Sequence, residues 1–326
     1  MYTPPFTVTD EILHLVSEIS EQIGTLNALL GERMPSPMLR KENQIKTIHS
    51  SLAIEHNSLS LQQVTDVIDG KHVLGAPNEI QEVKNALQAY RLMMQLDAYE
   101  ETDLLRAHGL MMVDLVENAG HYRKGSVGVF DGDKCIHLAP PADRVPTLMA
   151  ELFAWVKETK IHPLISSCVF HYEFEFIHPF MDGNGRMGRY WQTLLLSRWK
   201  GIFAWLPVET IVKRHQPDYY QAIARSDAKG DSTVFIVFML NCILQTINEQ
   251  QKVTDKVTDK VTDKSGASVL DLIRKQPHIT IPEMMRAMDM SDSGIRKILR
   301  RLQQQGKLHR VGANKNGYWE IITNKQ

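Results

Sequence analysis

The sequence predicts a mainly α-helical protein in two parts: a large helical part with one β-hairpin, and a small tail of three helices and two strands. In the first 250 residues, apolar side chains recur every three or four positions, as in EIQEVKNALQAYRLMMQL after Asn78. Two short β-type runs flank Asp131 and Gly132, a pair that favours a two-residue hairpin turn. The pattern changes after VTDK is repeated three times at residues 253–264.

The VTDK repeat divides the chain. A period of four residues with valine as the only apolar type cannot bury enough surface to offset the entropy lost on ordering. We therefore expect a linker at 251–265, or at most a solvated extension of a helix. The expected divisions are an N-terminal helical region at 1–95, a helical core at 96–250 and a tail domain at 266–326.

Composition excludes several classes of protein. The 326 residues are 43% hydrophobic and 23% charged with a net charge of −1, which is typical of a soluble globular protein. Three dispersed cysteines, Cys135, Cys168 and Cys242, argue against a disulfide framework or a zinc site. The first residues lack the pattern of a signal peptide, and the longest apolar run, 234–240, is too short to cross a membrane. We expect a cytoplasmic protein without a membrane partner.

The densest group of polar residues is IHPFMDGNGRMGR at 177–189. Its glycines match G-x-G-x-x-G, but no series of strands alternates with helices around it, which excludes a dinucleotide-binding fold. No Gly-Lys-Ser/Thr follows, and H-E-x-x-H is absent, so a P-loop and a hydrolytic zinc site are excluded too.

The same segment can hold an anion. Gly183 and Gly185 lead into an amphipathic helix, whose backbone N–H groups and positive dipole end would form a cradle for phosphates. Asn184 could donate its side-chain amide into this cradle. Arg186 and Arg189, three residues apart on the first turns, would face the bound anion.

Two further residues complete the chemistry. Asp182 is an oxygen ligand of the kind that holds Mg²⁺ jointly with substrate phosphates. His178 has an ordinary pKa near neutrality and could take a proton from an attacking hydroxyl. Taken singly, each feature has an ordinary structural explanation: a histidine before proline, a glycine turn or a solvated arginine pair. Their compact order favours phosphoryl or nucleotidyl transfer.

HPFMDGNGRMGR resembles the signature of the Fic family, H-P-F-x-[D/E]-G-N-G-R-x-x-R, at every fixed position, and the resemblance extends over about 60–250. It implies a Fic-type helical bundle with one β-hairpin flap. It also implies transfer of AMP from ATP to a Ser, Thr or Tyr hydroxyl of a target protein.

The resemblance assigns roles to particular residues. His178 would be the base, Asp182 would bind Mg²⁺, and Arg186 and Arg189 would neutralise the leaving pyrophosphate. Asp227 stands where relatives often have asparagine, and its carboxylate could still accept from the adenine amino group. The flap residues Lys134, Cys135, Ile136 and His137 would align the target by strand addition. The implied ATP contacts are Gly183, Asn184, Gly185, Arg186, Met187, Gly188, Arg189, Tyr219, Tyr220 and Asp227.

A second segment, SSLAIEHN at 50–57, resembles the inhibitory helix of Fic proteins, [S/T]-x-x-x-E-[G/N], with Ser51 and Glu55 as the spaced pair. The match departs at His56, where Gly or Asn is usual. The resemblance implies a helix at about 41–57 whose Glu55 pairs with Arg189 and keeps ATP in an unproductive pose. The same glutamate could instead position water to remove AMP, and the alternative is a surface helix that ends in a turn. Inhibition would act within one chain, and a homodimer could modulate it.

The tail has the order of a winged helix: three helices followed by two strands around a turn. From residue 265 onward it carries eleven Lys or Arg and five Asp or Glu. Arg296, Lys297, Arg300 and Arg301 lie on the third helix, where a DNA-recognition helix would meet phosphates. The alternative is a winged helix used for dimerisation or docking.

Two functions therefore compete for the whole chain. One is an AMP transferase with ATP and Mg²⁺ as substrate and cofactor. The other is a transcriptional regulator whose Fic domain senses a nucleotide. His178 favours the transferase, because a sensor would not need a base.

Overall fold

The structure, a computed structural model, describes residues 2–30, 36–131, 134–312 and 317–322. For 27–30, 128–131, 134–138 and 253–267 it describes the backbone alone. The chain forms two compact units, Met1–Gln250 and Gln251–Gln326, and each is described by itself.

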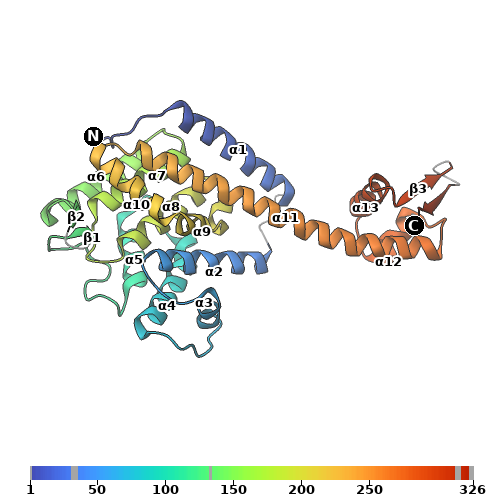
Figure 1. The fold of residues 1–326 in the computed structure, drawn as a ribbon, viewed down its shortest axis with the longest axis horizontal. Coiled ribbons are helices and arrows are strands. Elements are labelled where there is room, and N and C mark those ends of the chain that lie inside the picture. The colour runs from blue at the N-terminus through green and yellow to red at the C-terminus, as the bar shows by residue number, and fades with distance from the viewer. Residues whose placement is uncertain (1, 31–35, 132–133, 313–316, 323–326) are drawn as a thin grey trace. The chain divides into compact units, whose positions relative to one another are not determined.

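Helices build the first unit, so the predicted mainly α-helical class is confirmed (Figure 1). Short 3₁₀ turns follow α4 at Met93–Gln95, precede α6 at Ala142–Arg144 and follow α8 at Gly201–Trp205. The α-helices are α1 (Asp10–Leu30), α2 (Pro37–Ile54), α3 (Leu61–Ile68), α4 (Pro77–Leu92), α5 (Glu101–Met112), α6 (Val145–Glu158), α7 (Pro163–Ile177), α8 (Asn184–Trp199), α9 (Val208–Arg214), α10 (Gln216–Lys229) and the first part of α11 (Thr233–Lys275).

Helix α8 lies at the centre of this unit. Tyr190, Trp191 and Leu194 on it are fully buried, and each large apolar side chain contributes roughly 2–3 kcal/mol of transfer free energy. Helix α7 packs closely on α8 at Gly188, where an added Cβ would stand 2.8 Å from the ring of His171. The N-terminal end of α8 is therefore held in place by the core of the unit.

Local sequence signals set several helix ends. Ser60 and Gln63 form a capping box at the start of α3, with the Gln63 N–H donating to Ser60 Oγ at 3.2 Å. Helix α4 begins one residue before the expected Asn78, because Pro77 suits the first turn of a helix. Helix α5 ends at Met112.

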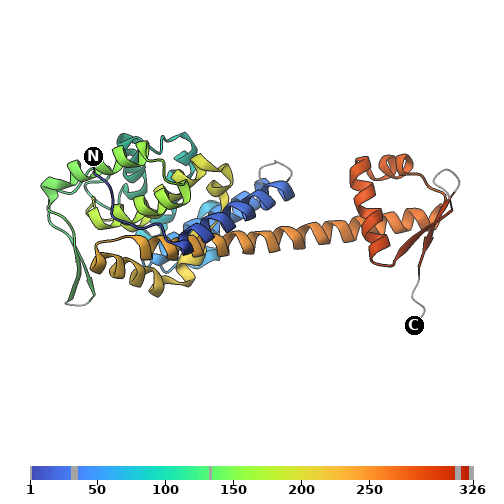
Figure 2. The ribbon, with the colours of Figure 1, turned by 90° about the horizontal axis from the view of Figure 1, so that it is seen from above.

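The predicted hairpin is present as β1 (Gly128–Asp131) and β2 (Lys134–Leu138). The strands are antiparallel, with Gly128 opposite Leu138 and a register shift after Val129. Figure 2 shows this hairpin extending away from the helices of its unit. The turn residue Gly132 lies outside the described residues.

Residues 2–9 pack along the first unit. The Ser232 N–H donates to the Pro5 carbonyl at 3.0 Å, and the Tyr2 hydroxyl donates to Glu173 at 2.7 Å.

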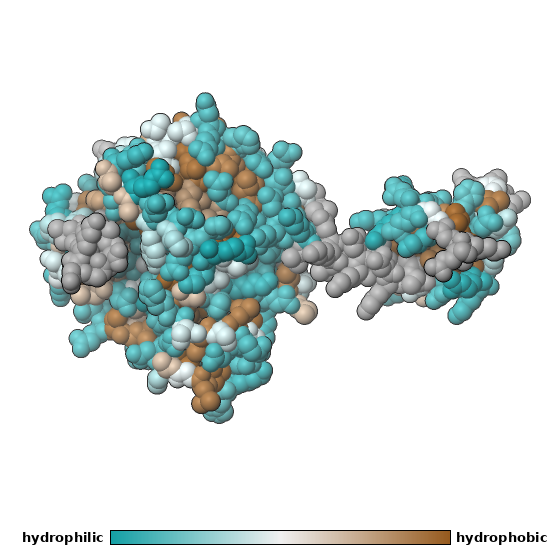
Figure 3. All heavy atoms as spheres, viewed as in Figure 1, coloured by the Kyte–Doolittle hydropathy of each residue, from teal (hydrophilic) through white to brown (hydrophobic). Residues whose placement is uncertain are grey.

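The face drawn in Figure 3 is mainly hydrophilic with scattered apolar side chains. Exposed apolar residues of the first unit include Leu61 on α3 and Leu74 just before α4. No described helix combines the length and apolarity needed to cross a membrane.

The second unit contains the end of α11, α12 (Ile281–Met288), α13 (Asp292–Gln304), β3 (Leu308–Val311) and β4 (Tyr318–Ile321). Its small core includes Val269, Ile295 and Leu308. This is the expected order of three helices and an antiparallel strand pair.

The VTDK repeat is helical in the structure, where α11 continues through it. Of the two forms expected for the repeat, a linker or an extension of a helix, its backbone takes the helical form. The division of the chain at 251–265 stays a prediction. The repeat contains neither Gly nor Pro, and adding residues to an existing helix costs far less than nucleating one.

Candidate active site

The turn between α7 and α8 carries the polar motif. His178 caps the end of α7 with φ +50°, and Gly183 caps the start of α8 with φ +82°. Both lie in the left-handed region, which is costly for residues other than glycine. A side chain at Gly183 would also require Met112 to move, since a Cβ would stand 2.7 Å from Met112 Sδ. The chain therefore reverses direction sharply within five residues.

Asn184 closes this turn. Its Oδ1 accepts from the Phe180 N–H, and its Nδ2 donates to the Phe180 carbonyl, both at 2.9 Å. The side chain is 2% exposed. The amide oxygen and one amide N–H are thus engaged by one backbone unit, and this shapes the loop. Donation of the second N–H into the anion cradle stays a prediction.

Arg189 is fixed by the end of α2. Its Nη2 donates to Glu55 Oε1 at 2.8 Å and to the Ser51 carbonyl at 3.0 Å, and its Nε donates to Ser51 Oγ at 3.3 Å. Burial lowers the pKa of the Arg189 guanidinium, but Glu55, Tyr219 and Glu175 together outweigh this and raise the pKa above its ordinary value. The structure thus contains the pair of Glu55 and Arg189 that the resemblance to the inhibitory helix implied.

The Glu55 carboxylate lies against the first turn of α8. A Cβ on Gly185 would stand 2.3 Å from Glu55 Oε1 and 3.1 Å from Arg189 Nη1. Among the described residues, that buried Nη1 has no hydrogen-bond partner. A carboxylate thus occupies the helix N-terminus where the sequence predicted a phosphate.

Arg186 is held by a second carboxylate that the sequence did not reveal. This side chain, 4% exposed, donates from Nη1 to Glu82 Oε1 at 2.9 Å and from Nη2 to Asp182 Oδ1 at 3.1 Å. Glu82 lies on α4 and also accepts from Asn57 Nδ2 at 2.7 Å. No local spacing connects Glu82 with the motif, because 104 residues separate it from Arg186.

Asp182 is the residue best placed for a metal ion. Its side chain is 58% exposed, and its Oδ1 also accepts from the Gly183 N–H at 2.6 Å. The described residues hold no cluster of three or more metal-ligating side chains. Mg²⁺ usually takes one or two carboxylates together with substrate phosphates, so a single carboxylate beside the cradle fits its chemistry.

His178 is half-buried, and its Nδ1 lies 3.4 Å from the Glu175 carbonyl. Donation from Nδ1 would leave Nε2 with the lone pair that a base requires. The Glu175 carboxylate stands 3.7 Å from His171 Nε2. Burial raises the pKa of this carboxyl, but His171, His178 and Arg189 together lower it below its ordinary value.

His108, on α5, contacts the turn between α7 and α8, and no sequence pattern identified it. Its Nδ1 accepts from the Gly120 N–H at 2.8 Å, so the proton on Nε2 points to the Asp182 carbonyl at 3.1 Å. Its ring stacks on Phe180 with centroids 3.6 Å apart. Burial is the main reason that its pKa falls to about 4, so the ring is neutral at pH 7.

The residues expected to contact the nucleoside differ in their exposure and in their partners. Tyr219 is 1% exposed, and its hydroxyl lies 3.1 Å from His171 Nε2, so it belongs to the core. Tyr220 is 44% exposed. Asp227 accepts from the Tyr172 hydroxyl at 2.8 Å. Met187 and Gly188, also expected to contact ATP, face the packed interior.

The last carbonyl groups of α2 are held by α9 and α10. Lys213 Nζ donates to the Ala53 carbonyl at 2.6 Å, and Gln216 Nε2 and the Tyr220 hydroxyl donate to the Ile54 carbonyl at 2.9 and 3.2 Å. These groups satisfy the end of a helix that would otherwise lack partners. They fix α2 immediately before Glu55.

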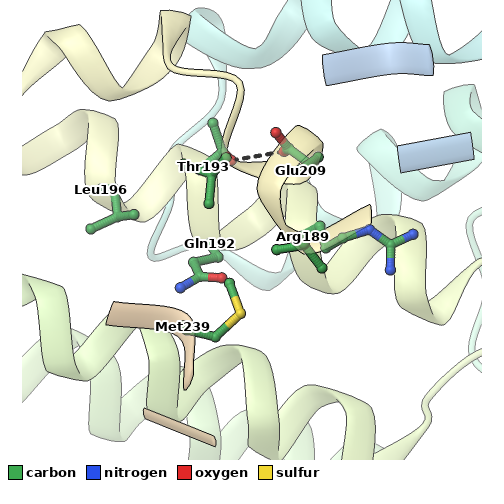
Figure 4. A pocket seen from close by; sticks show the side chains of 8 residues that line it. Arg189, Gln192, Thr193, Leu196, Glu209 and Met239 are labelled. Atoms are coloured by element: carbon green, nitrogen blue, oxygen red, sulfur yellow. Dashed lines mark hydrogen bonds between the residues drawn. The ribbon is translucent and has the colours of Figure 1, made fainter. Parts of the chain in front are cut away.

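Behind Arg189 lies a small cavity lined by α8, α9 and α11, with about 10 Å³ open to the centre of a water molecule. Figure 4 shows the Arg189 guanidinium pointing away from it, while Thr193 donates to Glu209 at 3.3 Å. Burial raises the pKa of Glu209. The cavity has room for about one water molecule and not for a nucleotide.

Other predicted residues lie apart from this group. Lys134, Cys135, Ile136 and His137 are on β2, and their side chains lie outside the described part of the structure. The basic residues of α13 belong to the second unit. Arg296, Lys297 and Arg300 are exposed and Arg301 is partly buried, and Arg296 pairs with Asp292 at 2.5 Å.

Residues 96–196 match the Fic/DOC family. A Fic family protein of Desulfovibrio desulfuricans G20, known from a crystal structure, is 45% identical over the full length of both chains with a TM-score of 0.75. Proteins named protein adenylyltransferase Fic from Aedes aegypti and Culex quinquefasciatus are 28% and 30% identical over 71% and 64% of this chain. The chain spans less than half of these two relatives, 46% and 42% of their lengths.

The neutral state of His108 predicts a pH dependence of stability. In the unfolded chain an ordinary histidine binds a proton below about pH 6.5, whereas the folded pKa is about 4. The unfolded state therefore binds more protons between these values, and stability is lost as pH falls from about 6.5 to 4, by up to about 3 kcal/mol.

We expect His108→Gln to flatten this part of the curve of unfolding free energy against pH, measured by urea denaturation. His14→Asn, at an exposed histidine, is the control. Parallel curves for the wild type and His108→Gln would contradict the assignment.

Proposed function

The chain belongs to the Fic/DOC family, and from this premise we propose that it is a protein adenylyltransferase, which transfers AMP from ATP to a Ser, Thr or Tyr hydroxyl of a target protein. The observation that carries the proposal is the turn between α7 and α8. It brings together a histidine, an exposed carboxylate, a helix N-terminus and two buried guanidinium groups.

His178 Nε2 would take the proton of the target hydroxyl as its oxygen attacks the α-phosphate of ATP. The bond from the α-phosphate to the bridging oxygen breaks, and pyrophosphate leaves. The α8 N-terminus and Arg186 and Arg189 would receive the negative charge of the leaving group, an arrangement typical of phosphoryl and nucleotidyl transfer. Mg²⁺ held by Asp182 would neutralise phosphate charge.

The nucleoside would lie toward α10. Tyr220 is the exposed tyrosine there, and Asp227 would accept from the adenine amino group, because a carboxylate offers acceptors only. Tyr219 would act indirectly, by packing behind this surface. Backbone N–H groups of Gly183, Asn184 and Gly185 would cradle the phosphates, and β2 would align the target chain.

We further propose that Glu55 inhibits transfer within the chain. Its carboxylate occupies the anion position at α8 and holds Arg189, so a γ-phosphate must compete with it. Arg189 is 2% exposed while Glu55 is 31% exposed. The carboxylate can therefore move toward solvent, whereas the guanidinium cannot. The same position would suit a residue that orients water to remove AMP.

The divisions of the chain follow from these roles. We assign regulation to 1–95, catalysis to 96–250, the connection to 251–265 and the winged helix to 266–326. A homodimer could adjust the position of α2, which carries Glu55.

Because Glu55 is proposed to inhibit transfer and His178 to catalyse it, substitutions of these two residues should have opposite effects. We expect Glu55→Gly to raise modification of lysate proteins and of the chain itself by roughly tenfold or more. A tenfold change corresponds to about 1.4 kcal/mol, here the free energy with which Glu55 competes with the γ-phosphate for Arg189. Adding His178→Ala should lower the rate about 10²- to 10⁴-fold, the usual contribution of a general base. The measurement uses each α-labelled nucleoside triphosphate with Mg²⁺, followed by mass spectrometry of labelled proteins.

His56→Gly is the matched control, since it places glycine beside Glu55 at a residue with φ +68° and leaves the carboxylate intact. Glu55→Gly with no more activity than wild type would refute the inhibitory role. Release of AMP from a modified target by wild type, and its loss in Glu55→Gly, would support the removal reaction.

The cap of α2 gives a graded version of the same test. Lys213→Met removes a charge-assisted hydrogen bond to the Ala53 carbonyl, which is worth about 1.5–3 kcal/mol, and should raise basal transfer less than Glu55→Gly does. Arg214→Met is the control, because Arg214 pairs with Glu249 rather than with α2. Equal activities of the two variants would show that the cap does not restrain Glu55.

A regulator that binds DNA is the second candidate function, favoured by the exposed Lys297 and Arg300 on α13. If the chain is a DNA-binding regulator, it is retained on DNA at about 50 mM salt, and its affinity for DNA falls steeply as the salt concentration rises. Replacing both residues by alanine should weaken binding and reduce the salt slope by about 1 for each lost phosphate contact. Lys229→Ala, in the first unit, should have no effect, and absence of retention would favour a docking role.

A further inference from the structure

Arg123, between α5 and β1, is a buried side chain that the sequence did not single out. It is 2% exposed. Its Nε donates to the His178 carbonyl at 2.8 Å and its Nη1 to the Gly125 carbonyl at 2.9 Å. Its Nη2 donates to the carbonyls of Pro140 and Ile177. The backbone N–H of Arg123 donates to the Pro179 carbonyl at 2.9 Å.

Two of these hydrogen bonds satisfy backbone carbonyl groups at the C-terminal end of α7. The last carbonyls of a helix lack partners inside the helix, and a cation near them is stabilised by the helix dipole. Arg123 satisfies the carbonyls of Ile177 and His178 at this end. His178 has φ +50°, a conformation that persists in a residue other than glycine only when its surroundings enforce it.

The other two side-chain hydrogen bonds join the two stems of the hairpin. Gly125 precedes β1 and Pro140 follows β2, and one guanidinium bonds to both. Three segments therefore meet at one planar group: the stem before β1, the stem after β2 and the turn that carries His178. In the described part of the chain its hydrogen-bond acceptors are carbonyl oxygens rather than carboxylates.

We propose that Arg123 is a positioning residue that fixes the His178 backbone relative to the hairpin. This rests on the proposed function, in which a target chain lies along β2 and presents its hydroxyl to His178. The distance between hairpin and base then decides whether the hydroxyl is in line with the α-phosphate. Guanidinium suits this task because its fork of five donors is planar and fixed, whereas an ammonium group is a compact charge on a flexible stem.

The predicted defect is specific. The phosphate cradle belongs to α8 and does not involve Arg123, so ATP binding should survive its loss. Misplacing a reacting group by about 1 Å can cost about 100-fold in rate. In a Glu55→Gly background, we expect Arg123→Lys and Arg123→Met to lower kcat about 10- to 100-fold, with the KM for ATP within about twofold of the parent.

Two measurements make the test. Initial rates of AMP transfer at varied ATP separate kcat from KM. Hydrogen exchange, followed by mass spectrometry without ATP, should show faster exchange at 134–139 and 178–183 and unchanged exchange at 190–199. Arg198→Met is the matched control, since Arg198 also donates to a backbone carbonyl, that of Leu96, away from the hairpin.

The outcomes are distinct. Arg123→Lys with the kcat and exchange of its parent overturns the proposal, and so does an equal fall in kcat for Arg198→Met. If Arg123→Met does not fold, Arg123→Lys decides. If the Glu55→Gly parent transfers no nucleotide, the proposed function fails, and the exchange result alone decides whether Arg123 holds the loop to the hairpin.

Discussion

Arg189 imposes the central constraint on this molecule, since its guanidinium is almost wholly buried between α2 and α8. Removing the partner of a buried charge typically costs 3–5 kcal/mol, so this group must always face an anion. In the structure Glu55 supplies that anion, and Ser51 accepts hydrogen bonds from Nε and Nη2 of the same guanidinium. In the proposed function a triphosphate would replace this carboxylate. The site would then be controlled by exchange of one anion for another rather than by opening of an empty pocket.

The second arginine obeys the same rule. Arg186 is also buried and also faces a carboxylate from the N-terminal helices, that of Glu82 on α4. Glu82 in turn bonds Asn57, two residues after Glu55. Asn57 stands one place after the position where the inhibitory pattern usually has Gly or Asn. The two arginines are thus linked through α4 as well as through α8.

Local spacing accounts for what the sequence predicted well, namely the hairpin and the helical class. The pairing of Glu55 with Arg189, 134 residues apart, was implied instead by the resemblance to the Fic inhibitory helix. Other residues whose partners are distant in the chain escaped prediction. Arg123 bonds a residue 55 positions away, and His108 bonds one 74 positions away. Neither sits in a pattern with a recognisable period, and only the folded chain brings them under the loop. The burial of Tyr219 escaped for the same reason, since its place depends on how α10 packs on α7.

The close approach of Glu55 to Gly185 has a consequence for how this protein can diversify. A Cβ at 185 would stand 2.3 Å from Glu55 Oε1, so any side chain there requires this carboxylate to move from its place beside Arg189. A substitution at Gly185 is therefore expected to weaken the ion pair as well as to alter the first turn of α8. In a variant that lacks the Glu55 side chain, position 185 can change without this penalty.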